Sequence, residues 1–440
     1  MKKYWDNGKL RVTDNGHYFA NGDTPFFLLA DTAWTLFQRL DKREAAVFLR
    51  NRKDKGFNTI YAVLINFQTR TNSAFDIQSG QTVEEIMVDA AYWDNILDIV
   101  VMAEDMGLYM GLLPVWGNVV KNKHLRTDNM GAYMGFIASK FSKFKNIIWI
   151  AGGDCRGDVE HDVWQMMGIQ LKQYFPNCLV GYHPFGRTCS SYWFQDAPWL
   201  DFHMFQSGHR RTDQRNLNAW DETASKEPWH GEESFKYVYA EYGKTPLRPV
   251  LDGEPSYEQI LQGLHNPAEP YWQDHHVRRY AYWSAFAGAA GHVYGHNSII
   301  QFYGAGGEAV YGVKETWDKS IHDIGSAQMG FLKGLMEKAS FQDCHTMQNV
   351  LADPTGQNQD DNLLALGNSQ CVLCYSYSGR DIAFNGNING IYDAYWFDPI
   401  SGAYSYFGEY QVKNATFTPP DKKSGWNDWV LVLNAPMTQA

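Results

Sequence analysis

The chain has few cysteines for its length. Six cysteines are spread over 440 residues, which excludes the dense disulfide framework of small secreted domains. Cys371 and Cys374 form a C-x-x-C pattern, but they lie in a run typical of a strand. Residues three apart in a strand point to opposite faces. We therefore expect two unrelated thiols there, rather than a metal or redox pair.

The sequence also lacks an excess of positive charge and any long hydrophobic run. It has 38 Lys and Arg against 49 Asp and Glu, a formal net charge of -11. Nucleic acids and anionic membranes both favour a basic face, so neither is expected as a partner. The opening residues Met1–Asp6 carry no apolar signal segment. We expect a cytoplasmic protein, secreted or periplasmic only if a leader has been removed.

Aromatic residues, in contrast, are abundant. The chain has 16 Trp, 26 Tyr and 25 Phe, together 15% of the residues. Such rings either fill a large core or form platforms for a ligand with apolar C–H faces and many hydroxyls, such as a sugar. Composition alone leaves both interpretations open.

Short apolar runs alternate with helical patterns as far as about residue 340. A capping box of Asp41 and Glu44, with Gly56 after the last turn, marks one of the helices. Alternation repeated about eight times predicts a (β/α)8 barrel over residues 1–343, rather than a doubly wound sheet. The expected strands are Phe26–Ala30, Thr59–Ile65, Tyr109–Val115, Ile147–Ala151, Cys178–Tyr182, Phe202–Phe205, Pro249–Leu251 and His292–Tyr294.

The pattern changes after Phe341, where helical periodicity stops and turn-rich short strands begin. Breakers such as Ser378-Gly379 and Ser401-Gly402 separate these strands. Residues 344–440 are therefore expected to form a small antiparallel β-sandwich. Its expected strands are Leu363–Leu366, Cys371–Tyr377, Tyr392–Phe397, Ala415–Phe417 and Val430–Leu433.

In a barrel of this kind, function lies at the carboxyl ends of the strands. No expected strand contains a lysine, which disfavours a Schiff-base aldolase, and no metal-ligand spacing recurs around the rim. We expect neither a metal nor another cofactor. The strand ends instead carry acids, amides, imidazoles and indoles, namely Asp31, Trp34, Asn66, Trp116, Asn118, Asp154, His183, Gln206, Asp252, Glu254 and His296.

Two of these carboxylates suit glycoside hydrolysis, in which one protonates the leaving oxygen and the other attacks, or guides water to, the anomeric carbon. Asp154 follows two glycines; it could instead cap the next helix, but Asp158 is the better candidate for that cap. Glu254 precedes a proline that stiffens its loop, and Asp252 lies one layer deeper as a supporting partner. An exchange of roles between Asp252 and Glu254 stays open.

The other strand-end residues are expected to bind substrate. Trp34 and Trp116, with Trp283 as a further ring, are candidates for stacking on a sugar, and Trp116 has a core role as its alternative. The alternative role of Asp31 is to cap the N-terminus of a helix. The alternative role of the histidines is structural hydrogen bonding. The expected substrate-binding set is Asp31, Trp34, Asn66, Trp116, Asn118, His183, Gln206 and His296.

An ordered set of motifs resembles the apiosidase-like glycoside hydrolases, namely glycoside hydrolase family 140 and its relatives. The resemblance implies a (β/α)8 barrel followed by a β-sandwich that is often labelled collagen-binding, although no residues here suggest a collagen site. It implies Asp154 as general acid and Glu254 as nucleophile, and removal of apiose from plant glycans. The motifs are Gly8-Lys9-Leu10-Arg11-Val12, Ala30-Asp31-Thr32-Ala33-Trp34, Trp149-Ile150-Ala151-Gly152-Gly153-Asp154, Tyr182-His183-Pro184, Gln206-Ser207-Gly208-His209 and Asp252-Gly253-Glu254-Pro255.

The hypothesis that follows is a retaining glycosidase acting on a β-linked furanosyl residue, with apiose as the first choice of sugar. Retention requires carboxyl groups about 5–5.5 Å apart, whereas a gap of about 6.5–9.5 Å indicates inversion. One alternative is a barrel glycosidase for another pentose or hexose, such as an arabinofuranosidase or galactofuranosidase. The other is a carbohydrate-binding protein without catalysis, in which the aromatic residues matter and the acids do not.

Overall fold

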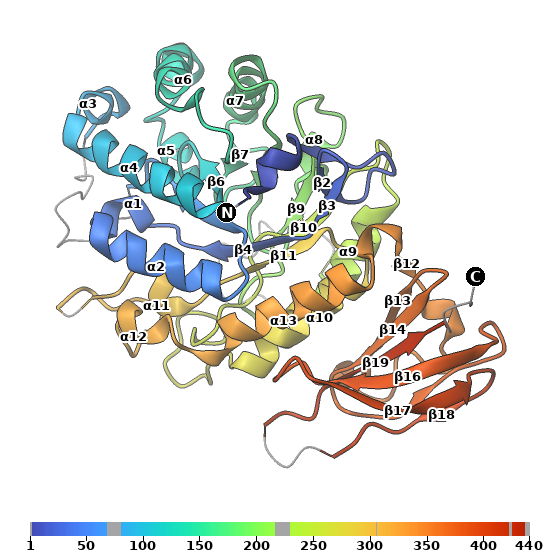
Figure 1. The fold of residues 1–440 in the computed structure, drawn as a ribbon. Coiled ribbons are helices and arrows are strands. Elements are labelled where there is room, and N and C mark those ends of the chain that lie inside the picture. The colour runs from blue at the N-terminus through green and yellow to red at the C-terminus, as the bar shows by residue number, and fades with distance from the viewer. Residues whose placement is uncertain (1, 68–80, 216–228, 305, 422–424, 436–440) are drawn as a thin grey trace.

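The computed structural model describes residues 2–67, 81–215, 229–304, 306–421 and 425–435. Within these ranges the chain forms a barrel of parallel strands and helices, and then an antiparallel β domain (Figure 1). The last long helix of the barrel ends at Lys338, and the first strand of the β domain begins at His345.

Eight parallel strands form the barrel, and they lie in chain order around it. Six make one continuous sheet in the order β11-β4-β5-β6-β7-β8, and the remaining two pair as β10-β9. The strands are β4 (Leu28–Thr32), β5 (Thr59–Val63), β6 (Tyr109–Leu113), β7 (Ile147–Gly152), β8 (Val180–His183), β9 (His203–Phe205), β10 (Val250–Asp252) and β11 (Gly291–Tyr294).

Single backbone hydrogen bonds connect the pair to the larger sheet on both sides. The N–H of Asp201 donates to the carbonyl of Val180 at 2.8 Å, next to β8 and β9. On the other side, the N–H of Ala290 donates to the carbonyl of Val250 at 2.9 Å, which brings β10 beside β11. The predicted (β/α)8 barrel is confirmed. Backbone hydrogen bonding between neighbouring strands is sparse at two places, between β8 and β9 and between β10 and β11.

Successive side chains of the strands pack into two different cores. On β5, Tyr61 and Val63 belong to the inner cluster, whereas Ile60 and Ala62 belong to the cluster under the helices. All five residues of this strand are buried. A strand buried on both faces produces a continuous apolar run instead of an alternating one, which is why these segments are recognisable in the sequence.

Helices of very different length follow the strands. The helix predicted from the capping box is α2, where Oδ1 of Asp41 accepts from two backbone N–H groups and Glu44 reaches back to the backbone of Asp41. The helices are α1 (Leu36–Arg39), α2 (Lys42–Asp54), α3 (Val83–Met87), α4 (Ala90–Met106), α5 (Gly117–Lys121), α6 (Thr127–Phe141), α7 (His161–Tyr174), α8 (Ser191–Phe194), α9 (Ser234–Tyr242), α10 (Asp274–Phe286), α11 (Asn297–Ile300), α12 (Trp317–Ser320) and α13 (Ile324–Lys338).

Two predicted details of this region are wrong. Phe26 does not begin the first barrel strand, because it ends β3 of a small N-terminal antiparallel sheet formed by β1 (Leu10–Val12), β2 (Phe19–Asn21) and β3 (Thr24–Phe26). This sheet packs on the amino ends of the barrel strands; for example, Nδ2 of Asn21 donates to the hydroxyl of Tyr109. Asp158 does not cap α7, because that helix begins at His161, after Glu160.

The C-terminal domain is a six-stranded antiparallel sheet in the order β12-β13-β14-β19-β16-β17, covered on one face by the two-stranded β15-β18. Cys371 and Cys374 on β14 face different cores and are free thiols, as predicted. The strands are β12 (His345–Thr346), β13 (Leu363–Gly367), β14 (Cys371–Ser376), β15 (Ile382–Ala383), β16 (Ile391–Phe397), β17 (Tyr404–Gln411), β18 (Thr416–Phe417) and β19 (Trp429–Asn434).

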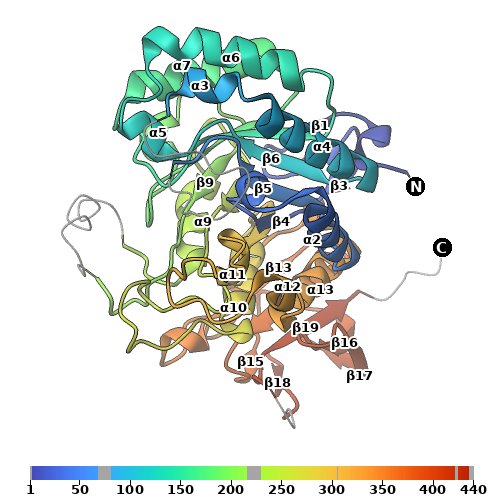
Figure 2. The same cartoon turned by 90° about the vertical axis from the view of Figure 1, so that its left-hand side faces the viewer.

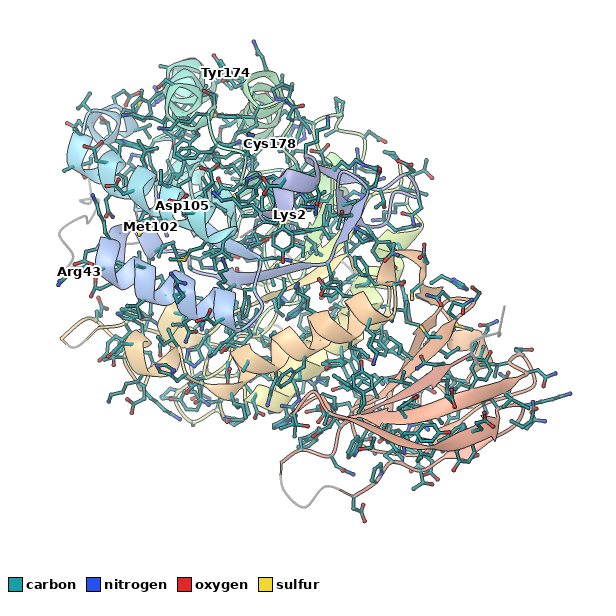
Figure 3. All side chains as sticks on the ribbon, in the orientation of Figure 1. Lys2, Arg43, Met102, Asp105, Tyr174 and Cys178 are labelled. Atoms are coloured by element: carbon teal, nitrogen blue, oxygen red, sulfur yellow. The ribbon has the colours of Figure 1, made fainter. Side chains whose placement is uncertain are left out.

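The two domains share one apolar core. Helices α10 and α13 lie between the barrel strands and the C-terminal sheet (Figure 1). Tyr282 of α10 stacks on Tyr375 of β14, with ring centroids 4.7 Å apart. Side chains fill the space between the ribbons of both domains, whereas the labelled Arg43, Asp105 and Tyr174 lie on the outside of the helical layer (Figure 3). Among the described residues, every helix is too short or too polar to cross a lipid bilayer.

Candidate active site

A cavity of about 460 Å³ lies at the carboxyl ends of the barrel strands. Figure 2 looks onto this end of the barrel, where the short helices α5 and α11 follow β6 and β11. Six of the residues expected at the strand ends line the cavity: Trp34, Asn66, Trp116, Asp154, Gln206 and Glu254. Both expected catalytic carboxylates are therefore in one cavity.

Asp154 reaches the cavity through an unusual stretch of backbone. Gly152, Gly153 and Asp154 have φ angles of +91°, +105° and +52°. A side chain at Gly153 would place its Cβ 2.8 Å from the Trp116 ring, and one at Gly152 would lie 2.3 Å from the carbonyl oxygen of His183. The glycines therefore allow Trp116 and β8 to approach the backbone closely. An L residue at positive φ costs about 1 to 3 kcal/mol and is found at functional sites.

Two imidazoles lie against Glu254, one hydrogen-bonded to it and one in ion-pair contact only. Nε2 of His209 is 2.9 Å from its Oε1, and Nε2 of His183 is 3.2 Å from its Oε2. The Glu254 carbonyl also accepts from the N–H of Gly208 at 3.0 Å. Burial acts to raise the pKa of Glu254, but the contacts with His183 and His209 outweigh it and lower the pKa to about 2. Glu254 is therefore ionised at any ordinary pH.

Asp154 has the opposite electrostatic character. Its carboxyl faces the open cavity, yet its surroundings remove enough water to raise its pKa, and the negative charge of Glu254 raises it further, to about 6. Two carboxyl groups in one cavity thus have pKa values on opposite sides of the ordinary range. Such a pair supplies a proton donor and an anion at the same pH, which is the requirement for acid and nucleophile in glycoside hydrolysis.

Asp252 lies beneath this pair and does not line the cavity. It is fully buried, and its carboxylate accepts from the hydroxyl of Ser207 at 2.6 Å and from the Ser207 N–H at 3.3 Å. Burial raises its pKa to about 7. Asp252 therefore anchors the loop after β9, whereas Glu254 is the carboxylate that faces the cavity.

An aromatic wall stands beside the two carboxylates. The rings of Trp34 and Trp116 have centroids 5.1 Å apart, and both residues line the cavity. Nε1 of Trp34 donates to the hydroxyl of Tyr257 at 3.2 Å, which fixes the indole orientation. Gln206 lies on the same cavity, and its Oε1 has no hydrogen-bond partner among the described residues. The cavity thus combines aromatic rings with a polar side chain.

The structure does not bring Asp31, Asn118, His183 or His296 to the cavity surface. Asp31 is fully buried and forms an ion pair with Arg52 of α2. His296 caps α11, with its Nδ1 accepting from Ser298 N–H, while its Nε2 is 2.8 Å from Asp323. These contacts give Asp31 and His296 structural roles in place of the expected substrate contact.

Three further expected positions, Asn118, His183 and Trp283, also lie outside the cavity lining. Asn118 lies in α5, half-buried. His183 touches Glu254 and the backbone of Asp154, so it supports the carboxylates from behind. Trp283 is fully buried and packs on Phe235 and Tyr377 at the domain junction. Of the three tryptophans proposed as stacking rings, Trp283 thus belongs to the core, whereas Trp34 and Trp116 line the cavity.

Several cavity residues were not expected from the sequence. His209 is the clearest, because only Gln206 of its motif was expected to contact substrate. Tyr257 follows Glu254 by three residues, and three arginines, Arg39, Arg187 and Arg210, also line the cavity. The signal for His209 and Tyr257 was their position shortly after a strand end.

No group of three or more His, Cys, Asp or Glu side chains in the described part of the chain is arranged to hold a metal ion.

Comparison with known families agrees with this geometry. Residues 13–343 match the family model described as "Apiosidase-like, catalytic domain". The chain belongs to the apiosidase-like family. Residues 347–434 match a second model, "Putative collagen-binding domain of a collagenase". A comparison with curated protein sequences gives no match.

Solved structures extend the family likeness over the whole chain. A glycoside hydrolase family 5 protein from Bacteroides vulgatus ATCC 8482 is 36% identical with a TM-score of 0.91, and the alignment covers 100% of this chain and 96% of that one. A second structure, described as a glycoside hydrolase, has the same identity and TM-score and covers 100% and 99%. This apiosidase-like chain is a glycosidase, and its substrate is therefore a carbohydrate.

Proposed function

We propose that the protein is a retaining glycosidase that releases a β-linked furanosyl residue, with apiose as the first choice, from plant glycans or glycosides. The observation that carries the proposal is the divided pKa of the two cavity carboxyls, about 6 for Asp154 and about 2 for Glu254. The choice of apiose rests on the apiosidase-like family to which residues 13–343 belong.

The proposed reaction has two steps. Asp154 donates its proton to the departing glycosidic oxygen while the Glu254 carboxylate attacks the anomeric carbon. In the second step Asp154 removes a proton from water, which displaces Glu254 and releases the sugar. Formation of the glycosyl ester removes the negative charge of Glu254. Because that charge helps to raise the pKa of Asp154, its loss makes Asp154 ready to act as a base.

The size and lining of the cavity support a small glycosyl unit rather than a flat polymer surface. About 460 Å³ is within the range of ligand cavities, roughly 300–1,000 Å³. Trp34 and Trp116 offer ring faces beside the carboxylates, and Gln206 offers an amide for a sugar hydroxyl.

The second candidate is a glycosidase for another pentose or hexose, such as an arabinofuranosidase or a galactofuranosidase. The same pair of carboxylates would serve it, and only the shape of the cavity would distinguish the sugars. A carbohydrate-binding protein without catalysis would not need a carboxyl with raised pKa beside an ionised one.

A panel of para-nitrophenyl glycosides tests these proposals together with apiose-bearing plant glycosides, and released sugar is identified by thin-layer chromatography. We expect release from the β-D-apiofuranoside by the wild type and none by Glu254→Gln. The control is Glu258→Gln, which changes a buried glutamate outside the cavity and should keep activity. Release from arabinofuranosides or galactofuranosides alone would select the second candidate. Binding without turnover would reject a glycosidase mechanism at these residues.

Stereochemistry tests the double displacement separately. Proton NMR during the first minutes of hydrolysis identifies the anomer that is released before mutarotation. Retention of the β configuration is expected, whereas release of the α anomer would show direct displacement by water and would reassign Glu254 as a general base.

A further inference from the structure

His183 is a buried histidine in contact with both of the proposed catalytic residues. It is the last residue of β8 and is fully buried. Its Nδ1 accepts a hydrogen bond from the backbone N–H of Asp154 at 3.2 Å, and its Nε2 lies 3.2 Å from Oε2 of Glu254. Each ring nitrogen therefore has its own contact, one with the acid and one with the nucleophile.

The contact at Nδ1 decides which ring nitrogen carries the proton. A nitrogen that accepts from an N–H group cannot carry a hydrogen itself, so the neutral imidazole is protonated at Nε2. That N–H lies next to Glu254, with Nε2 3.2 Å from Oε2, a charge–dipole contact outside the geometry of a full hydrogen bond. The two contacts of His183 thus depend on each other, because a proton moved to Nδ1 would disrupt both of them.

The contact with Asp154 acts where the backbone is strained. Asp154 has a φ of +52°, in the region that the Cβ of an L residue disfavours. A hydrogen bond from its N–H to a rigid acceptor helps to hold this conformation. The imidazole is itself confined by Trp34 and Trp116, whose ring centroids are 5.3 Å and 5.8 Å from its own.

We infer that His183 is a positioning residue that couples Asp154 and Glu254, with Nδ1 holding the Asp154 backbone and Nε2 in contact with the Glu254 carboxylate. The inference rests on the proposed roles of Asp154 and Glu254. His183 is not part of the cavity lining, so it acts through these two residues and not on the substrate.

Other groups around Glu254 limit the size of the expected effect. His209 holds its second oxygen at 2.9 Å, Asp154 and Asp252 lie close enough for charge interaction, and the Tyr257 hydroxyl interacts with it as well. Because His209 stays in place when His183 is replaced, Glu254 should lose only part of its stabilisation.

Two substitutions separate the two contacts. In His183→Asn, the side-chain amide lies near the former position of Nδ1. It retains an acceptor for the Asp154 N–H but loses the contact with Glu254. In His183→Gln, the longer side chain places its amide near the former position of Nε2. It retains a donor for Glu254 but loses the hydrogen bond from the Asp154 N–H. The substrates are the dinitrophenyl and the unsubstituted phenyl glycosides of the sugar that the panel identifies.

The two variants should behave differently. For His183→Asn, the pH at which kcat/KM falls on the acidic side of the profile should rise by about one unit, because Glu254 becomes easier to protonate. For His183→Gln, the decrease of kcat/KM at acidic pH should occur at the same pH as in the wild type. The loss of kcat/KM should be at least about tenfold greater on the phenyl glycoside than on the dinitrophenyl glycoside, because only the phenyl leaving group depends on proton donation by Asp154.

The matched controls are His203→Asn and His203→Gln. His203 is an equally buried histidine on the neighbouring strand β9, 3.4 Å from the hydroxyl of Ser190 and in contact with neither carboxylate. The His203 variants should show the same pH dependence of kcat/KM and the same dependence on leaving group as the wild type. If the His183 variants show the same uniform behaviour as the His203 variants, the coupling role is wrong.

A measurement without substrate separates this inference from the proposed function. Nitrogen NMR of histidine-labelled wild type, with the His183 ring signals assigned by correlation to its own backbone resonances, should show a protonated Nε2 and an unprotonated Nδ1. A protonated Nδ1 would overturn the inference. If the wild type hydrolyses no glycoside but shows the expected tautomer, the proposed function fails and the contact remains. Because the NMR uses the wild type, it decides the matter even if the variants do not fold.

Discussion

Arg278 of α10 and Asp428 of the C-terminal domain form a two-point ion pair in which both side chains are fully buried. Nε of Arg278 is 3.0 Å from Oδ2 of Asp428, and Nη2 is 3.0 Å from Oδ1. Asp274 and Gln328 complete the surroundings of the guanidinium at 2.7 Å and 2.6 Å. The β domain thus supplies one of the two carboxylates that pair with a buried charge on a barrel helix.

We predict that Asp428→Ala destabilises the protein by about 3 to 5 kcal/mol, because it leaves a buried charge with too few partners. The double variant Arg278→Met with Asp428→Leu should recover much of the loss, since neither charge then remains. Thermal unfolding measures both. Glu315→Ala, which removes an exposed ion pair with Lys319, should leave the melting temperature unchanged. A mild effect of Asp428→Ala would mean that the domains are not coupled through this pair.

Activity should depend on pH through the two carboxyls. Hydrolysis needs Asp154 protonated and Glu254 ionised, so the reactive form predominates above the Glu254 pKa of about 2 and below the Asp154 pKa of about 6. As pH rises through about 6, Asp154 loses its proton and kcat/KM should fall tenfold per unit. Far-UV circular dichroism at each pH checks that the fold persists. A profile that stays flat to pH 8 would contradict Asp154 as the acid.

Asp154→Asn should lower the rate according to the leaving group. An amide cannot protonate the departing oxygen, so an alkyl glycoside should lose about 10² to 10⁴-fold, whereas a dinitrophenyl glycoside needs little protonation in the first step. Asp158→Asn is the control, because Asp158 is exposed, pairs with Arg156 and does not line the cavity. Equal losses on both substrates would contradict the role.

Gly153→Ala should impair catalysis with little global unfolding. The added Cβ would lie 2.8 Å from Trp116 at a φ of +105°, so the ring or the Asp154 loop must shift. A shift of about 1 Å at an active site costs about 10²-fold in kcat/KM. Gly131→Ala is the matched control: Gly131 lies inside α6 with open space around it, and the substitution should slightly stabilise the helix. Unchanged kcat/KM in Gly153→Ala would show that the close packing there is not required.

The barrel could be predicted because its strands are buried on both faces. Segments such as Thr59–Val63 leave continuous apolar runs between helical patterns, and this signal is local. The N-terminal sheet was missed because its strands are three residues long and partly exposed. Strand β17 was missed for a similar reason, since it is an edge strand whose Ser405 and Glu409 are exposed between aromatic residues.

The candidate site, too, could be predicted only in part from the sequence. The order of strands and the residues at their ends identify Asp154 and Glu254 as candidates, because parallel strands in a barrel finish at one end. Register cannot tell whether a side chain at a strand end faces the mouth or the helices. Asp31 and His296 satisfy the same sequence criterion as Glu254, yet they contact Arg52 and Asp323.

The sequence by itself thus determines the strand and helix pattern of the barrel, the position of the two carboxylates at strand ends, and the family. Only the tertiary structure decides that His183 and His209 converge on Glu254, because β8 and the loop after β9 are brought together by barrel closure. It also decides that Asp154 shares a cavity with that ionised group. The pKa of a carboxyl depends on burial and on charges distant in sequence, so the difference between acid and nucleophile appears only in the folded chain.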